Sequence, residues 1–223
     1  MKTTFDLGSL DTELIAQATV ETVHMVGLSS LLTVLFGLPL GVLLVLTRPG
    51  GPLAIPALHR VLGAVVNVGR SLPFVILMIA VIPLTRALAG TSIGPTAAVV
   101  PLTIGAVPFF ARLAESALLD VDPGLVEAVT SMGARTDQVV VKVLLPEALP
   151  GLVRAFTVTV VTLVSYSAMA GVIGGGGLGD LAVRYGYQRF ETAVMVVTVV
   201  VLIVLVQLVQ ALGDAAARRV DHR

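Results

Sequence analysis

The chain has 223 residues, of which 56% are hydrophobic and 13% are charged, against about 45–50% and 25% in soluble domains. This composition excludes an ordinary soluble domain and indicates an integral membrane protein. The formal net charge is zero, so overall charge gives no argument for binding nucleic acid, and the absence of cysteine excludes disulfide bonds and thiolate metal sites.

Five stretches are apolar and long enough to cross a membrane, since a bilayer core needs about 20 apolar residues in helical form. Residues 1–18 precede them as a polar tail, which is not a signal peptide because the triplet Ala16–Ala18 comes before the apolar run. We predict a single all-α membrane domain over residues 1–223. The predicted spans are residues 20–47, 66–86, 94–117, 152–173 and 190–212, with a polar loop at residues 118–150.

Glycine and charged residues mark two places in the first two spans. Gly37 and Gly41 form a small-xxx-small pair, which lets another helix approach closely, either within this chain or from a second subunit. Arg70 lies in an apolar context, where a charge costs about 2.5–3.5 kcal/mol at the bilayer centre. We expect it at the inner headgroup level, starting the second span with Pro73 in its first turn. A contact with a partner protein or with the polar loop is compatible with this position.

The polar loop opens with a pattern typical of helix starts. Asp122 can act as the N-cap, and Pro123 takes the first helical position, where a missing N–H costs nothing. Gly133 follows where a left-handed residue ends a helix. The residues between them place apolar side chains on one face, namely Leu125, Val126, Val129 and Met132.

A second short helix is predicted from Thr136 to about Leu145, where Pro146 stops it. The loop therefore consists of two short amphipathic helices joined at a glycine. Such a pair is suited to docking into a socket on another protein.

The segment after the fourth span is polar and then rich in glycine. Residues 174–179 match the spacing Gly-x-Gly-x-x-Gly, but they follow a membrane span instead of a strand, which argues against a dinucleotide site. We interpret the glycine run as a tight loop between helices; the alternative is a lining or outer gate of a transport pathway. The candidates for that lining are Ser165, Tyr166, Ser167 and Met169.

The distribution of Lys and Arg predicts the orientation in the membrane. With the polar loop inside, ten of the 14 basic residues lie on the cytoplasmic side and four on the outer side. This bias follows the positive-inside rule. The N-terminus is then predicted outside and the C-terminus in the cytoplasm, which five spans permit.

Residues for catalysis or cofactor binding are missing from the pattern. A P-loop needs a lysine after a glycine-rich turn, and neither Lys2 nor Lys142 has one. His24, His59 and His222 are far apart and have no carboxylate at ligand spacing, so we expect no metal site. The chain is predicted not to be an enzyme and to bind no cofactor.

The polar loop resembles the "EAA" loop of ABC-importer membrane subunits. The pattern consists of Glu127, Ala128 and Val129, then Gly133 four residues after Val129, and a late Val143–Pro146. Val129 departs from the second alanine of the family pattern but leaves the face apolar. In that family the loop docks into a cleft of the cytoplasmic ATPase. The resemblance implies that the ATPase-coupling residues are Glu127, Ala128, Val129, Gly133, Val143, Leu145 and Pro146.

Other segments resemble the permease subunit of bacterial methionine ABC importers. These are residues 67–73, 101–109 and 166–187, and the resemblance extends over about residues 20–213. It implies a multi-pass protein of the bacterial inner membrane that is surrounded by lipid and works as a homodimer. It further implies two ABC ATPase subunits and an extracytoplasmic substrate-binding lipoprotein as partners, with methionine in D- and L-forms as substrate.

Three alternatives stay open at this point. Another small solute, such as a different amino acid, a phosphonate or a sulfonate, would use the same docking loop. A channel or ion-driven carrier often places Asp, Glu or His deep within its spans, and none lies deep in these five. A membrane scaffold without transport activity would have no reason to display such a helix pair.

Overall fold

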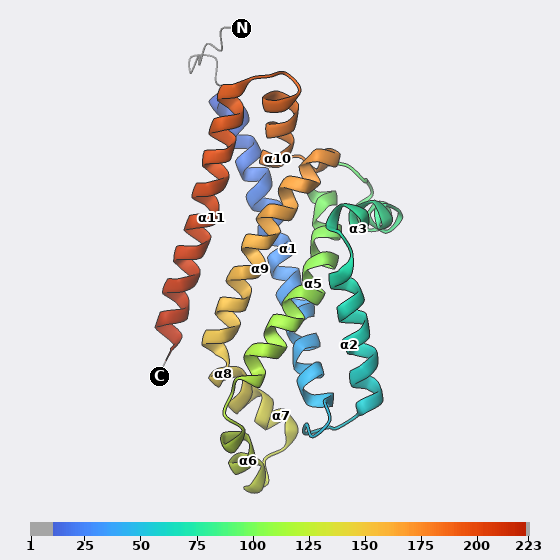
Figure 1. Cartoon of the computed structure of the whole chain (residues 1–223), viewed down its shortest axis with the longest axis vertical. Coiled ribbons are helices and arrows are strands. Elements are labelled where there is room, and N and C mark those ends of the chain that lie inside the picture. The colour runs from blue at the N-terminus through green and yellow to red at the C-terminus, as the bar shows by residue number, and fades with distance from the viewer. Residues whose placement is uncertain (1–10, 222–223) are drawn as a thin grey trace. The chain divides into compact units, whose positions relative to one another are not determined.

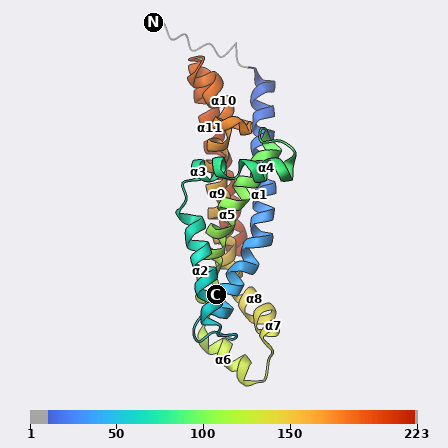
Figure 2. The same ribbon diagram turned by 90° about the vertical axis from the view of Figure 1, so that its right-hand side faces the viewer.

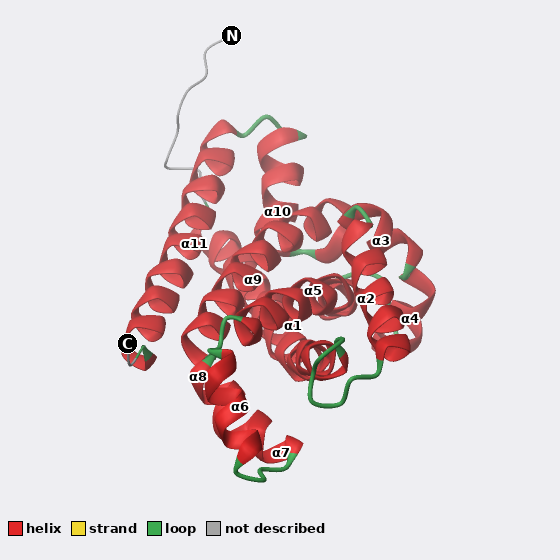
Figure 3. Cartoon of the chain, turned by 60° about the horizontal axis from the view of Figure 1, so that its bottom comes forward, coloured by secondary structure: helices red, strands yellow, loops and turns green. Residues whose placement is uncertain are grey.

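The computed structural model describes residues 11–221, and within them every regular element is helical (Figure 3). Four helices are long and apolar enough to cross a membrane, and the bent pair α2 and α3 raises the number to as many as five. The predicted all-α membrane fold is therefore confirmed. The long elements are α1 (Thr12–Thr47), α2 (Pro56–Ser71), α5 (Pro95–Leu119), α9 (Leu149–Ala170) and α11 (Thr192–Val220).

Within residues 11–221, six short helices and three π-helical segments connect the long elements. The short helices are α3 (Phe74–Ala80), α4 (Ile82–Ala89), α6 (Pro123–Ser131), α7 (Thr136–Val139), α8 (Leu145–Glu147) and α10 (Gly177–Leu181). The π-helical segments are Val140–Leu144, Gly171–Gly175 and Ala182–Tyr187.

Helix α1 begins earlier than the sequence suggests. The Asp11 side chain accepts hydrogen bonds from the backbone N–H groups of Glu13 and Leu14 at 3.1 and 3.2 Å. This N-cap starts the helix at Thr12, so the second half of the predicted polar tail is helical. Residues 1–10 lie outside the described part of the chain.

The predicted second span, residues 66–86, falls on three helices instead of one. Helix α2 ends at Ser71, Leu72 is extended, and Pro73 precedes α3. Proline disfavours the helical conformation in the residue before it, which explains the bend. Arg70 thus occupies the exposed last turn of α2 instead of the start of a helix, and Pro73 stands before the first turn of α3.

The contacts of the chain divide it into two compact units. Of the described residues, the glycine unit contains 11–31, Pro73–Ile104 and Val160–Val209. The loop unit contains Leu32–Leu72, Gly105–Thr159 and 210–221. Each unit has its own buried cluster of apolar side chains.

The core of the loop unit forms where α1, α5 and α9 pack together. A Cβ at Gly41 would lie 2.8 Å from the Ala111 carbonyl oxygen, and one at Gly37 would lie 2.9 Å from the Phe110 ring. The two glycines therefore let α5 approach α1 closely, which is the first of the two alternatives that their spacing left open. Phe110 also packs edge to face on Phe156 of α9, with ring centroids 6.4 Å apart.

The glycine unit is built around α10. Figure 1 shows α10 beside α1 and α11. Leu178 and Leu181 of this short helix are buried together with Ala18 of α1 and Val194 of α11. The predicted tight turn is present at Ile173, Gly174 and Gly176, whose backbone is not helical, but the run then continues as the buried helix α10, which the prediction lacked. Tertiary packing decides the conformation of α10, and glycine alone gives no signal for it.

Candidate functional site: a docking loop and a groove

The polar loop of residues 118–150, called the docking loop below, has two arms. The first arm consists of α6 with Asp122 before it and Gly133 after it, and it has the predicted local structure. The Asp122 carboxylate accepts a hydrogen bond from the Gly124 N–H at 2.8 Å, and Pro123 begins α6. Gly133 has φ of 84°, and a Cβ there would meet nothing within 4 Å. Asp122 and Gly133 thus act as the predicted start and end signals, and the left-handed turn reverses the chain in open space.

The second arm, which runs from Thr136 to Glu147, differs from the prediction at its end. Helix α7 passes into the π-helical segment Val140–Leu144, and helical structure continues through Pro146 to Glu147. The predicted stop at Pro146 is therefore wrong. The Leu145 N–H donates to the Val140 carbonyl five residues back. This wider turn explains why the proline ring, which clashes in a regular helix interior, is tolerated here.

Apolar side chains anchor the two arms on the core of the loop unit. Val139 and Leu144 are buried against Val45 and Leu118, and Val126 and Val129 pack partly onto the same cluster. Leu144 is thus the main anchor of the late segment, whereas Val143 and Leu145 are half-buried and Pro146 is exposed. Glu127 and Ala128 are exposed as well.

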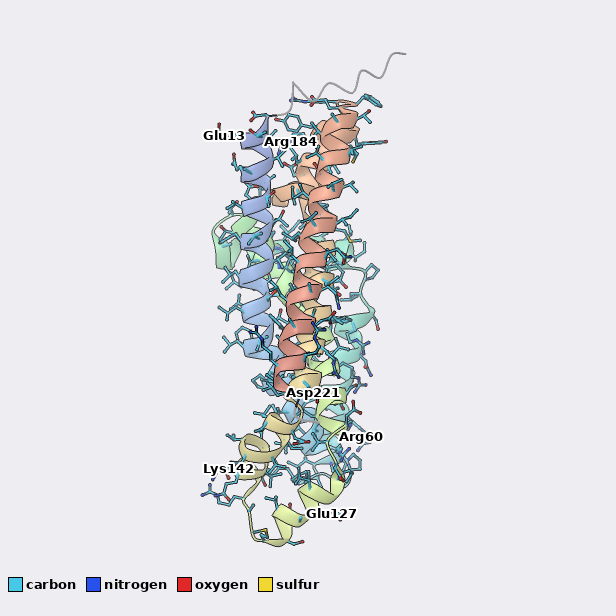
Figure 4. All side chains as sticks on the ribbon, turned by 90° about the vertical axis from the view of Figure 1, so that its left-hand side faces the viewer. Glu13, Arg60, Glu127, Lys142, Arg184 and Asp221 are labelled. Atoms are coloured by element: carbon cyan, nitrogen blue, oxygen red, sulfur yellow. The ribbon has the colours of Figure 1, made fainter. Side chains whose placement is uncertain are left out.

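The first arm exposes charged and large apolar side chains on its outer surface. Figure 2 shows α6 and α7 as two separate arms, and in Figure 4 Glu127 and Lys142 project from different arms. Leu125 and Met132 are also exposed, and Met132 is 86% accessible. The resemblance did not mark these two residues, although the helical spacing placed them on the apolar face of α6. An exposed apolar patch of this kind is typical of a docking surface.

A cavity of about 570 Å³ lies between the first arm and the connection that follows α1. Its floor is apolar and includes Val121 and Val139, which belong to the core of the loop unit. Its polar lining consists of Arg48, Glu127, Thr130, Ser131 and Thr136.

An ion pair between a half-buried arginine and a buried glutamate lies near the end of α5 in the same unit. Arg112 contacts Glu115 at 2.6 Å and donates to the Asn67 side chain at 3.3 Å, and Glu115 is buried. A buried carboxylate needs such a partner because its desolvation is costly. The spacing of three residues could have indicated this pair in the sequence.

The four predicted pathway residues lie on different faces of α9. Ser165 and Met169, one helical turn apart, line a groove of about 630 Å³ in the glycine unit. Tyr166 stacks on Phe74 with ring centroids 4.4 Å apart, and Ser167 is buried and donates to the Val164 carbonyl at 2.7 Å. The groove is otherwise lined mainly by apolar and small residues, including Ala168, Val172, Gly179, Ala182, Leu202 and Ile203.

Charged residues gather in the segment that follows α10. Arg184 pairs with Asp180 one turn earlier, and the Arg189 guanidinium lies 4.4 Å from the centroid of the Tyr185 ring. Among residues 11–221 no three His, Asp or Glu side chains come together as a possible metal site. His59 instead lies with Nδ1 3.0 Å from the Leu44 carbonyl oxygen.

The family of the chain follows from its sequence. Residues 37–222 match a family model described as the inner membrane component of binding-protein-dependent transport systems. The chain belongs to this family. It is therefore a non-enzymatic, multi-pass component of the inner membrane.

Relatives with assigned names are similar over most of the chain. A protein of Vibrio cholerae serotype O1, named a probable D-methionine transport system permease protein, is 58% identical over 96% of both chains. The D-methionine transport system permease protein of Escherichia coli K12 is 56% identical over 68% of this chain and 70% of its own length.

Solved structures agree with this family. A chain of the MetNI methionine ABC transporter in an inward facing conformation superimposes with a TM-score of 0.93 at 50% identity, covering 95% of this chain and 98% of that chain. A chain of an amino acid ABC transporter crystallised with histidines has a TM-score of 0.77 at 20% identity and shows the shared fold alone.

Proposed function

We propose that the chain is the membrane-spanning permease subunit of an ATP-driven importer of methionine, in both the D- and L-forms. The observation that carries this proposal is the 58% identity, over 96% of both chains, to a protein named for D-methionine transport. The superposition on a methionine ABC transporter at a TM-score of 0.93 supports it.

The proposed assembly contains two copies of this chain, two ATPase subunits and an extracytoplasmic substrate-binding protein. The docking loop is the proposed contact with the ATPase, because the first arm exposes Leu125, Glu127 and Met132. The second arm is fixed to the core of the loop unit through Val139 and Leu144. A force on α6 is therefore transmitted to the membrane helices instead of being absorbed by a flexible loop.

The proposed orientation places the docking loop in the cytoplasm and the N-terminus outside. Ten of the 14 basic residues are then cytoplasmic, among them Arg135 and Lys142 of the loop itself. ATP binding closes the paired ATPases, the two docking loops move with them, and the permeases switch as rigid bodies from inward-open to outward-open. ATP supplies the differential binding energy between these two states.

The proposed pathway lining in the glycine unit is the groove beside Ser165 and Met169. A thioether side chain is flexible and polarizable, so Met169 suits contact with an apolar, sulfur-containing solute. Tyr166 and Ser167 support the wall from behind through the stacking on Phe74 and the bond to the Val164 carbonyl.

Coupling is tested by transport in vesicles that contain the permease, its ATPase and its binding protein. Glu127→Lys reverses the charge on the exposed face of α6, and Gly133→Pro cannot adopt the φ of 84°. Both variants are expected to abolish methionine uptake while the permease stays folded. Glu13→Lys, at an exposed position in the first turn of α1, is the matched control. Parental uptake by both loop variants in an intact assembly would contradict the coupling role.

The substrate is tested by competition in the same vesicles. Unlabelled D- and L-methionine are expected to compete with labelled methionine, whereas other amino acids, phosphonates and sulfonates are not. Uptake that is blocked only by one of the latter solutes would assign the chain to an importer of that solute.

A further inference from the structure

Two side chains of α1 hold the start of α10. The Glu21 carboxylate oxygen Oε2 accepts a hydrogen bond from the Gly177 N–H at 2.8 Å. The Thr22 hydroxyl accepts one from the Leu178 N–H at 2.9 Å. These bonds join positions 156 residues apart in sequence. They occupy the N–H groups that a helix start leaves without partners.

Glu21 and Thr22 each make one further hydrogen bond within α1. Gln17 Nε2 donates to Glu21 Oε1 at 3.2 Å, and the Thr22 hydroxyl donates to the Ala18 carbonyl at 3.0 Å. Thr22 is 1% exposed and Leu178 is 0% exposed. Glu21 is half-buried and Gln17 is exposed. The buried bond between Thr22 and Leu178 holds the two helices firmly, because any movement there leaves a buried polar group unpaired.

The glycines at the start of α10 fit closely against the same two side chains. A Cβ at Gly176 would lie 2.8 Å from Glu21 Oε2, and one at Gly177 would lie 2.6 Å from the Thr22 hydroxyl. Both residues also have positive φ, of 76° and 74°. The sequence Gly176-Gly177 is therefore needed for the backbone turn and for the close approach to α1.

The opposite side of α10 packs on α9. A Cβ at Gly179 would overlap the backbone of Ala168, which lies between Ser167 and Met169. Gly179 and Ala168 both line the groove beside Met169. Helix α10 is thus held between α1 on one side and the groove-lining part of α9 on the other.

We propose that Glu21 and Thr22 are positioning residues for transport, because they clamp α10 to α1 and so keep one wall of the groove fixed throughout the transport cycle. This proposal rests on the proposed function of the groove as a pathway. The two residues do not contact the solute; they act through α10.

The first test measures methionine uptake and ATP hydrolysis by the assembled transporter in vesicles. Glu21→Ala removes a charge-assisted bond and is expected to lower the maximal uptake rate about ten-fold. Thr22→Val should lower uptake as well, and Thr22→Ser should restore it because the hydroxyl is kept. ATP hydrolysis should continue at the parental rate in all variants, since the docking loop is unchanged. Glu13→Ala is the control at an exposed position of the same helix.

The second test measures whether α10 stays in contact with α1 during the transport cycle. The chain has no cysteine, so Ala18→Cys and Leu181→Cys, which replace two residues of one buried cluster, can be joined selectively. Oxidising the two thiols directly to a disulfide with a copper–phenanthroline oxidant, a bond that a reductant cleaves, is expected to leave uptake unchanged. Uptake that stops on linking and returns on cleavage would overturn the fixed-wall proposal.

The outcomes separate this proposal from the proposed function. Parental uptake by both Glu21→Ala and Thr22→Val overturns the clamp while the importer assignment stands. If Glu21→Ala does not assemble, the comparison of Thr22→Val with Thr22→Ser decides the matter, because equal uptake by the two contradicts a role for the hydroxyl. A parental chain that binds no ATPase would refute the proposed function instead.

Discussion

Gly133 in the docking loop and Gly177 at the start of α10 both have a positive φ but different surroundings. Their φ values are 84° and 74°. A Cβ at Gly133 would meet open space, whereas one at Gly177 would meet the Thr22 hydroxyl at 2.6 Å and Met25 Cε at 2.8 Å. Gly133 is thus required only by its own backbone, and Gly177 by its backbone and by its neighbours. The turn in the docking loop is thus determined by residues near it in the sequence, whereas the α10 segment depends on contacts with residues far away in the sequence.

The largest effect on stability is expected for Gly177→Ala, which tests the glycine that is closely packed against α1. The left-handed conformation and the overpacking against α1 together should cost about 3 kcal/mol. Thermal unfolding of the purified protein in detergent should show a clearly lowered midpoint, with loss of methionine uptake. A midpoint equal to that of the parent would mean that α10 moves away from α1 at little cost.

A smaller effect on stability is expected for Gly133→Ala, which tests the glycine that has open space around it. Only the left-handed conformation opposes the new methyl group there, so the free energy of unfolding should fall by about 1 kcal/mol. Asparagine tolerates this conformation better, and Gly133→Asn should therefore unfold nearer to the parental midpoint. If Gly133→Ala destabilises the protein as much as Gly177→Ala, the contrast between the two glycines fails.

Asp122→Ala removes the cap of α6 and should have a comparable or smaller effect on stability. Loss of an N-cap typically costs about 1 kcal/mol, and Asp122 is exposed, so water replaces part of the lost bond. Asp122→Asn keeps an acceptor for the Gly124 N–H and serves as the matched control. Equal unfolding midpoints for the alanine and asparagine variants would show that the cap does not contribute.

The smallest change in stability is expected for Met132→Ser, because this side chain is 86% exposed. The isolated permease should unfold at the parental midpoint, while its affinity for the ATPase subunit falls about ten-fold through loss of apolar contact. Leu88→Ser, at an exposed position in the glycine unit, should change neither quantity. Unchanged ATPase affinity in Met132→Ser would remove the end of α6 from the proposed contact.

The same contrast explains which features could be predicted from the sequence. Asp122, Pro123 and Gly133 act through neighbouring backbone atoms, so their residue types alone indicated the first arm. Gly37 and Gly41 were found because their spacing places them on one helix face. These signals belong to patterns that lie within one or two helical turns.

Features that depend on residues far apart in the sequence could not be predicted. The buried helix α10 at the end of the glycine run could not be recognised, because its partners Glu21 and Thr22 are 156 residues away from the groups they bind. The stop expected at Pro146 fails because a π-helical turn precedes it. Leu144, the buried anchor, could not be separated from its neighbours Val143 and Leu145, because all three are apolar and only packing distinguishes them.

The exposed surface of α11 has a consequence for sequence variation. Only 11% of its most apolar stretch is buried, so aliphatic residues there can replace one another with little change in burial. Gly213 differs, because a methyl group on it would overlap Thr157. A saturation mutagenesis scan of this helix should therefore show broad tolerance of Val, Ile and Leu exchanges, interrupted by sharp intolerance at Gly213.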